Sequence, residues 1–75
     1  MKTFKLLNYG SDKLKRLNIL SHRLDAEILL SKVLNKDRED ILINLQKELK
    51  MDSIFEFNNL IKRRLSREPI AYITA

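Results

Sequence analysis

The sequence predicts an all-α fold, a small bundle of four to five helices, and three observations support this. The 75 residues include one glycine and one proline, too few turn-forming residues for a sheet of many strands. Hydrophobic residues make up 44% of the chain, and they recur at the three- and four-residue spacing of a helix face. Cysteine is absent and histidine occurs once, so the core must be held by packing alone.

The first predicted helix covers about residues 2–17. Three leucines give it an apolar stripe if it is helical: Leu7, Leu14 and Leu17. Gly10 and Ser11 interrupt this pattern, and glycine costs about 1 kcal/mol relative to alanine inside a helix. Either the helix bends here or Ser11 caps a second, shorter helix. We favour one helix with a weak middle.

The second predicted helix follows a short connection and runs to about Leu34. Ser21 is the expected N-cap, since its hydroxyl can accept a hydrogen bond from the free amides of the next turn. Asp25 and Glu27 lie in the first turns, where carboxylates favour the positive end of the helix dipole. A wide apolar stripe follows from five residues: Leu24, Ile28, Leu29, Val33 and Leu34.

A break at residues 35–36 precedes a short third helix. Asp37 and Asp40 have the spacing of an acidic capping box, which predicts a helix over about residues 38–44. Residues 41–45 could instead form a brief strand on β-propensity. A strand without a partner would leave its backbone groups unpaired, so we prefer the helix.

The fourth predicted helix begins at Asp52 or Ser53, after a polar connection over residues 46–50 in which Leu49 turns back into the core. Ser53 and Glu56 have the spacing of a capping box. One face of this helix is apolar and carries Ile54, Phe57, Ile61 and Leu65, with Phe55 and Leu60 beside them.

The last segment is the most specialised part of the sequence. Pro69 disfavours the α region for Glu68, so the fourth helix should end by Arg67. An extended or single-turn segment follows, and three of its side chains need something to pack on: Ile70, Tyr72 and Ile73.

No catalytic, cofactor-binding or metal-binding residue is predicted. A single glycine excludes glycine-rich phosphate loops, and the lack of cysteine excludes thiol chemistry. His22 lies in the first turn of the second helix, where we expect a solvated side chain. The carboxylates of Asp25 and Glu27 are explained by the helix dipole, and Arg23 or another nearby basic residue is a candidate ion-pair partner for them.

The chain is basic, with a net charge of +5. Two basic clusters, Lys13-Lys15-Arg16 and Lys62-Arg63-Arg64-Arg67, make a small nucleic-acid-binding helical domain the alternative function. Both clusters lie at predicted helix ends, where cations are favourable in any case, so nucleic acid is the less favoured partner. No apolar run is long enough for a membrane span or a secretory signal, and we expect a cytoplasmic protein with no membrane partner.

Two segments resemble a known family. The first resembles the second-helix signature of the N-terminal domain in the HemK/PrmC family and reads Ser21-His22-Arg23-Leu24-Asp25-Ala26-Glu27-Ile28-Leu29-Leu30. The second resembles the stretch that leads into the linker of that domain, and it runs from Arg63-Arg64 through Glu68-Pro69-Ile70-Ala71-Tyr72-Ile73-Thr74. The spacing between the segments also fits the family, whose members methylate the glutamine of the Gly-Gly-Gln motif in class 1 peptide chain release factors. The chain departs from the pattern at Ala75, where the family has glycine.

The resemblance implies a five-helix bundle joined by a linker to a Rossmann-like catalytic domain, which binds S-adenosylmethionine and carries an Asn-Pro-Pro-Tyr motif. Neither that motif nor a glycine-rich nucleotide loop occurs in these residues. Residues 1–68 would then be the bundle, and residues 69–75 the start of a linker toward a missing methyltransferase domain.

The function implied is recognition of the substrate by a non-catalytic N-terminal domain. The expected partners are a class 1 peptide chain release factor and the catalytic domain of the same chain, with S-adenosylmethionine bound in the parent protein and no cofactor in this fragment. Five residues are expected at the interdomain or substrate-side surface: Arg63, Arg64, Glu68, Pro69 and Tyr72.

Overall fold

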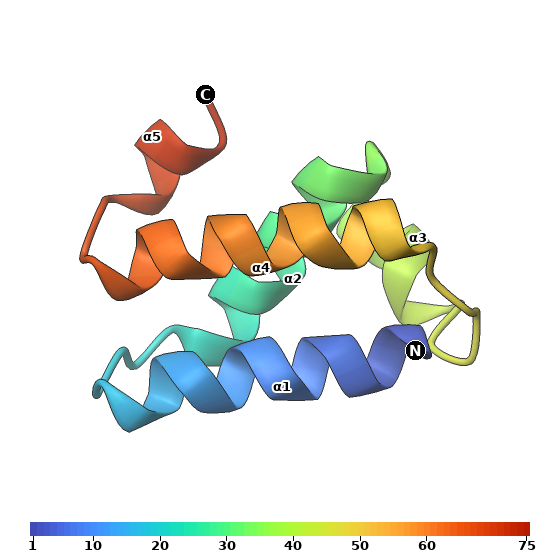
Figure 1. The fold of residues 1–75 in the computed structure, drawn as a ribbon, viewed down its shortest axis with the longest axis horizontal. Helices are drawn as coiled ribbons and strands as arrows, with labels where there is room; N and C mark the ends of the chain where they lie inside the picture. Colours follow the sequence, from blue (N-terminus) through green and yellow to red (C-terminus); the bar gives the residue numbers. More distant parts are fainter.

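The computed structural model describes all residues, 1–75, and confirms the all-α prediction. It contains five helices: α1 (Thr3–Arg16), α2 (His22–Leu34), α3 (Arg38–Leu42), α4 (Met51–Leu65) and α5 (Ile70–Ile73). In Figure 1, α1 and α4 run in the same direction in front, and α2 crosses behind them. The short helices α3 and α5 lie toward opposite ends of α4. None of the five helices has the length and hydrophobicity needed to cross a membrane.

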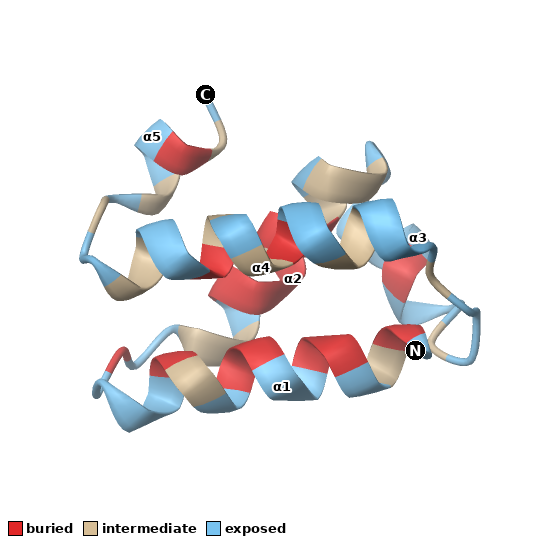
Figure 2. Ribbon diagram, viewed as in Figure 1, coloured by how far each residue is buried: buried red, intermediate tan, exposed pale blue.

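The core is a single cluster at the meeting point of the three long helices. Ala26, Leu29 and Leu30 of α2 are completely buried between α1 and α4, and Phe57 of α4 is the largest of the buried side chains. Figure 2 shows the buried residues of α1 along the side that faces α2 and α4. The other members of the core are Leu6, Leu7, Leu14, Ile19, Ile41, Ile61 and Ile73.

The prediction of one continuous first helix is confirmed, and the glycine in its middle has a packing reason. Gly10 is buried where α1 packs against α4. A Cβ atom at this position would lie 2.6 Å from Cζ of Phe57 and 3.0 Å from Cδ1 of Ile61. Glycine at position 10 therefore lowers the helix propensity of α1, but it allows α1 and α4 to approach closely.

Helix α1 begins without a side-chain cap. Its first amides instead donate to backbone carbonyls of the loop between α3 and α4: Thr3 N–H to Lys47 at 2.9 Å and Phe4 N–H to Leu45 at 2.9 Å. The Thr3 hydroxyl donates to the same Lys47 carbonyl at 2.9 Å. Groups that an isolated helix would leave unpaired are thus satisfied by a segment more than 40 residues away in sequence.

Ser21 and Asp37 occupy the N-cap positions of α2 and α3 as predicted, but the side-chain capping bonds expected of them are absent. The Ser21 hydroxyl donates to the Asp25 carboxylate at 3.0 Å and makes no capping bond, and Asp37 makes none either. Helix α4 begins at Met51, ahead of Ser53, with Lys50 in the cap position. The residue before each of α3 and α4, Asp37 and Lys50, is extended, and neither side chain makes a capping bond.

Some predicted core positions are also wrong. Leu17 and Leu24 are 41% and 43% exposed, because both lie at the end of the molecule where the turn between α1 and α2 leaves the bundle. Phe55 is 68% exposed on the outer face of α4. Helix α3 ends two residues earlier than predicted, and the alternative of a strand over residues 41–45 is not observed. Leu49 does pack against the core as predicted.

Candidate functional site

The predicted site lies at the end of α4 and the turn into α5. Helix α4 stops at Leu65, and the Ser66 hydroxyl donates to the Arg63 carbonyl at 2.6 Å. Arg67 adopts a left-handed backbone conformation with φ of 71°, which reverses the chain toward Pro69. The predicted helix stop before the proline is confirmed.

Arg63 and Glu68 form an ion pair across this turn. Arg63 Nε donates to Glu68 Oε1 at 3.2 Å, and its Nη2 donates to the other carboxylate oxygen. Hydrogen bonding to Arg63 lowers the pKa of the Glu68 carboxyl below its usual value, partial loss of water contact opposes this, and the positive charge of Arg63 adds to the lowering. The same hydrogen bond raises the pKa of Arg63. This exposed ion pair connects the last turn of α4 to the loop before α5.

Arg64 stabilises the same turn on the side that faces α2. Its Nε donates to Asp25 Oδ2 of α2 at 2.9 Å, and its Nη1 donates to the Glu68 carbonyl at 3.2 Å. The side chain of Asp25 is 5% exposed and that of Arg64 is 18% exposed. The two segments that carry the family resemblance therefore meet in one buried ion pair.

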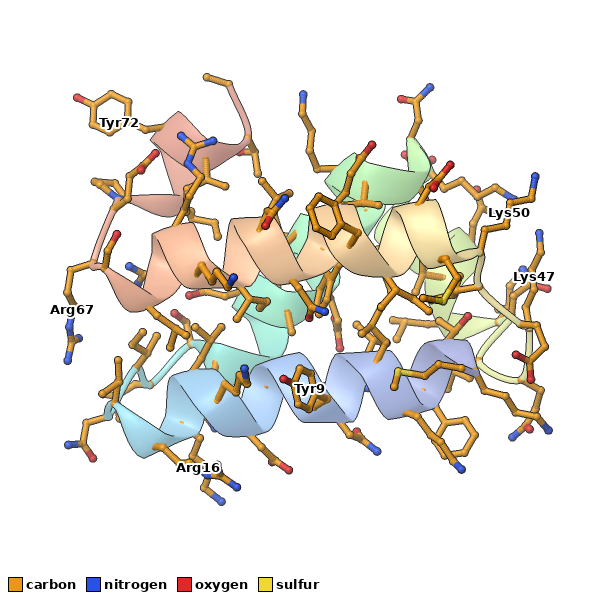
Figure 3. All side chains as sticks on the ribbon, viewed as in Figure 1. Tyr9, Arg16, Lys47, Lys50, Arg67 and Tyr72 are labelled. Atoms are coloured by element: carbon orange, nitrogen blue, oxygen red, sulfur yellow. The ribbon has the colours of Figure 1, made fainter.

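The rest of the predicted site lies on α5. Pro69 is the extended residue before this helix, Ile73 is buried in the core, and Ile70 packs against it. Tyr72 is 71% exposed, and Figure 3 shows its ring directed away from the bundle. The expected single turn is confirmed, and its two isoleucines find their packing partners within this chain. The boundary of bundle and linker at residue 68 stays a prediction.

The structure thus brings Arg63, Arg64 and Glu68 together, with Pro69 next in the chain and Tyr72 apart from them in solvent. Arg63 also lines a hollow between α2, α4 and α5. The other residues around this hollow are Lys32, Val33, Glu56, Asn59, Leu60 and Ile73.

The acidic residues of α2 form ion pairs in addition to lying near the start of the helix. Glu27 is buried and accepts from Arg23 Nε at 3.0 Å, as the sequence suggested, and from Arg38 Nη2 of α3 at 2.8 Å. Together with the pair made by Asp25, these contacts connect α2 to α3 and α4. Both carboxylates have a structural role.

The expectation that His22 is solvated is also wrong. The side chain is half-buried, and its Nδ1 lies 2.7 Å from the Ser11 hydroxyl of α1. Arg23 Nη1 donates to Asn8 of the same helix at 2.9 Å. The partners of these residues lie 11 and 15 positions away, so no local sequence pattern could have found them.

The two basic clusters differ in their pairing. In the second cluster, Arg63 and Arg64 are both in ion pairs, and Arg67 donates to the Leu17 carbonyl at 2.6 Å. In the first cluster no residue has a carboxylate partner. Lys13 lies over the ring of Tyr9 with its Nζ 4.6 Å from the ring centre. All three cations of the first cluster, and Lys62 and Arg67 of the second, therefore have no carboxylate partner in this chain.

Comparison with known proteins identifies relatives across nearly the whole chain. The family model for the PrmC N-terminal domain, which describes the sequences of that family, matches residues 5–74. A bifunctional methyltransferase of Rickettsia felis is 48% identical over 69 residues, which cover 92% of this chain and 13% of the relative. A release factor glutamine methyltransferase of Buchnera aphidicola is 45% identical over 73 residues, which cover 97% of this chain and 26% of the relative.

A further relative, the release factor glutamine methyltransferase of Clostridium botulinum, is 41% identical over 68 residues, or 91% of this chain and 24% of the relative. The chain thus spans 13% to 26% of the length of these three proteins. No solved structure matches it. With 70 consecutive positions covered by the family model, this chain belongs to the PrmC N-terminal domain family.

Proposed function

We propose that this chain is the substrate-recognition domain of an S-adenosylmethionine-dependent protein-(glutamine-N5) methyltransferase, which modifies the Gly-Gly-Gln glutamine of class 1 peptide chain release factors. The observation that carries the proposal is the similarity to two release factor glutamine methyltransferases over more than nine-tenths of this chain. In this proposal the domain itself performs no chemistry. It binds the release factor in the cytoplasm while another domain transfers the methyl group.

The residues of this chain do not fit S-adenosylmethionine, and we assign the cofactor to the parent protein. Nucleotide-binding α/β folds bring the backbone to the ligand at a glycine-rich turn. The one glycine here is Gly10, which lies inside α1 and is covered by Phe57. The carboxylates of Asp25 and Glu27 are already engaged by arginines.

A separate recognition domain suits this chemistry. The amide nitrogen of glutamine is a weak nucleophile, so its methylation depends strongly on orientation. Binding energy collected far from the reacting atoms can be used to position them. We propose that Arg63, Glu68, Pro69 and Tyr72 face the catalytic domain or the substrate, while Arg64 supports that surface through its bond to Asp25.

The test compares the parent enzyme with and without this domain. We expect removal of the domain to lower kcat/KM for an intact release factor and to leave kcat/KM for a short Gly-Gly-Gln peptide unchanged, because the peptide does not reach the domain. Direct titration of the release factor should show the same loss of affinity. Equal affinity and equal kcat/KM in the presence and absence of the domain would refute the proposal.

A further inference from the structure

The turn between α1 and α2 exposes an unusual amount of aliphatic surface. Leu20 is 95% exposed, and Leu17 and Leu24 on either side of it are 41% and 43% exposed. A single exposed leucine is ordinary on a protein surface. Three within eight residues place exposed aliphatic side chains around one turn, and exposed apolar surface gathered in one place marks interaction sites.

The same end of the molecule carries the surplus positive charge. Residues 13–24 include four basic residues and no acidic residue, whereas residues 36–52 include four basic and five acidic residues. Figure 3 shows Arg16 and Arg67 at the end where the turn between α1 and α2 lies, and Lys47 and Lys50 at the opposite end. The net charge of the chain is therefore unevenly distributed.

The cations around this turn are free to pair with a partner. No carboxylate of this chain pairs with Lys15 or Arg16, and Arg67 donates only to the neutral carbonyl of Leu17. That bond also connects the C-terminal end of α1 to the loop after α4. We name the set the basic apolar corner: Leu17, Leu20, Leu24, Lys15, Arg16 and Arg67.

We propose that the basic apolar corner docks on an acidic surface of the release factor, with Leu20 inserted into an apolar depression there. This inference rests on the proposed function and names the surface that performs it. The charge of the corner fits an acidic partner, and its exposed leucines gain most from burial against apolar protein surface. Nucleic-acid interfaces are more polar and favour aromatic stacking, which these leucines cannot supply.

The basic apolar corner lies near the segment that we propose to face the catalytic domain or the substrate. The turn from α4 into α5 lies at the same end of the molecule as the turn between α1 and α2 (Figure 1). A release factor bound to the corner would therefore lie beside the segment that we propose to face the catalytic domain.

The experiment measures binding of a class 1 release factor to the 75-residue chain by calorimetry, for the wild type and two variants. Leu20→Ser removes the central apolar contact, and Ile43→Ser is the matched control, because Ile43 is 78% exposed and directly follows α3, which lies at the opposite end (Figure 1). We expect Leu20→Ser to weaken binding about tenfold or more and Ile43→Ser to leave it unchanged. In ¹⁵N-labelled wild-type chain, the release factor should shift the amide signals of residues 15–24 and Arg67.

The outcomes separate this inference from the proposed function. Wild-type binding that Leu20→Ser leaves intact, with signal changes elsewhere, overturns the corner and keeps the proposed function. No wild-type binding overturns both. Two further results would also overturn the inference. One is salt-sensitive binding to duplex RNA through Lys15 and Arg16 that excludes the release factor. The other is a wild-type dimer that Leu20→Ser converts to monomer without any release-factor binding.

Discussion

At the scale of single residues, the pair between Asp25 and Arg64 shows how a sequence signature can serve packing. We predict that Asp25→Ala lowers the free energy of unfolding by roughly 3 kcal/mol, because it leaves the mostly buried guanidinium of Arg64 without a carboxylate. Urea denaturation followed by circular dichroism would measure this. The double variant Asp25→Leu/Arg64→Met removes both charges and should recover much of the loss. A double variant as unstable as the single one would contradict this explanation.

Gly10 offers a second test at this scale. We predict that Gly10→Ala destabilises the protein by roughly 1 kcal/mol, because overpacking against Phe57 and Ile61 exceeds the gain of about 1 kcal/mol in helix propensity. Thermal and urea unfolding would measure the change. Asp12→Ala, at an exposed site of the same helix, is the control and should not destabilise. A Gly10→Ala variant more stable than the wild type would show that α1 and α4 can separate without cost.

The pair between Arg63 and Glu68 predicts a pH dependence. The pKa of Glu68 is lowered in the folded state, so the ionised carboxylate stabilises the fold at neutral pH. This contribution is complete above the pKa that Glu68 has in the unfolded chain, and it is lost as the pH falls through its lower folded-state pKa. At pH 7 we expect the free energy of unfolding to be slightly larger for the wild type than for the Glu68→Gln variant. The difference should vanish in strong acid, and a difference that is constant with pH would contradict the assignment.

At the scale of elements, the sequence predicted those features that depend on neighbours along the chain. The spans of α1 and α2, the break at Asn35 and the helix stop before Pro69 all follow from periodicity or local backbone preference. The starts of α2 and α3 were also predicted, whereas α4 begins at Met51, ahead of the predicted Asp52 or Ser53. The capping of Thr3 and Phe4 by the carbonyls of Lys47 and Leu45 was not predicted, because these partners are distant in sequence. Arg64 could be placed in the site by resemblance, but its inward direction depends on Asp25, 39 residues away.

Helix α5 gives a prediction at this scale. It has four residues, too few to be stable alone, and it is held by the burial of Ile73 with Ile70 beside it. We predict that Ile73→Ala releases α5, so the amides of Ile73 and Thr74 exchange with solvent much faster while amides within α2 stay protected. Hydrogen exchange followed by NMR would measure this. Tyr72→Ala is the control, since this exposed side chain should not affect protection; equal loss in both variants would show that α5 is not held by its buried face.

At the scale of the whole molecule, a small core and an uneven charge distribution have separate consequences. One cluster of eleven buried residues stabilises the entire fold, so the charged surface can vary more freely than the interior. The basic apolar corner collects free cations at one end, while acids balance bases at the other. Net charge alone would attract an acidic partner in any orientation, whereas this distribution favours approach by one end.

This orientation predicts a kinetic difference between two charge reversals of equal size. We expect Lys15→Glu/Arg16→Glu to lower the association rate constant for the release factor severalfold and to flatten its dependence on salt. Lys47→Glu/Lys50→Glu should change both much less, because these lysines lie at the opposite end. Stopped-flow measurements across a range of ionic strength would compare them, and dissociation should depend more on Leu20 than on either pair. If both reversals slow association equally, then total charge steers the encounter, and the position of the corner contributes only after contact.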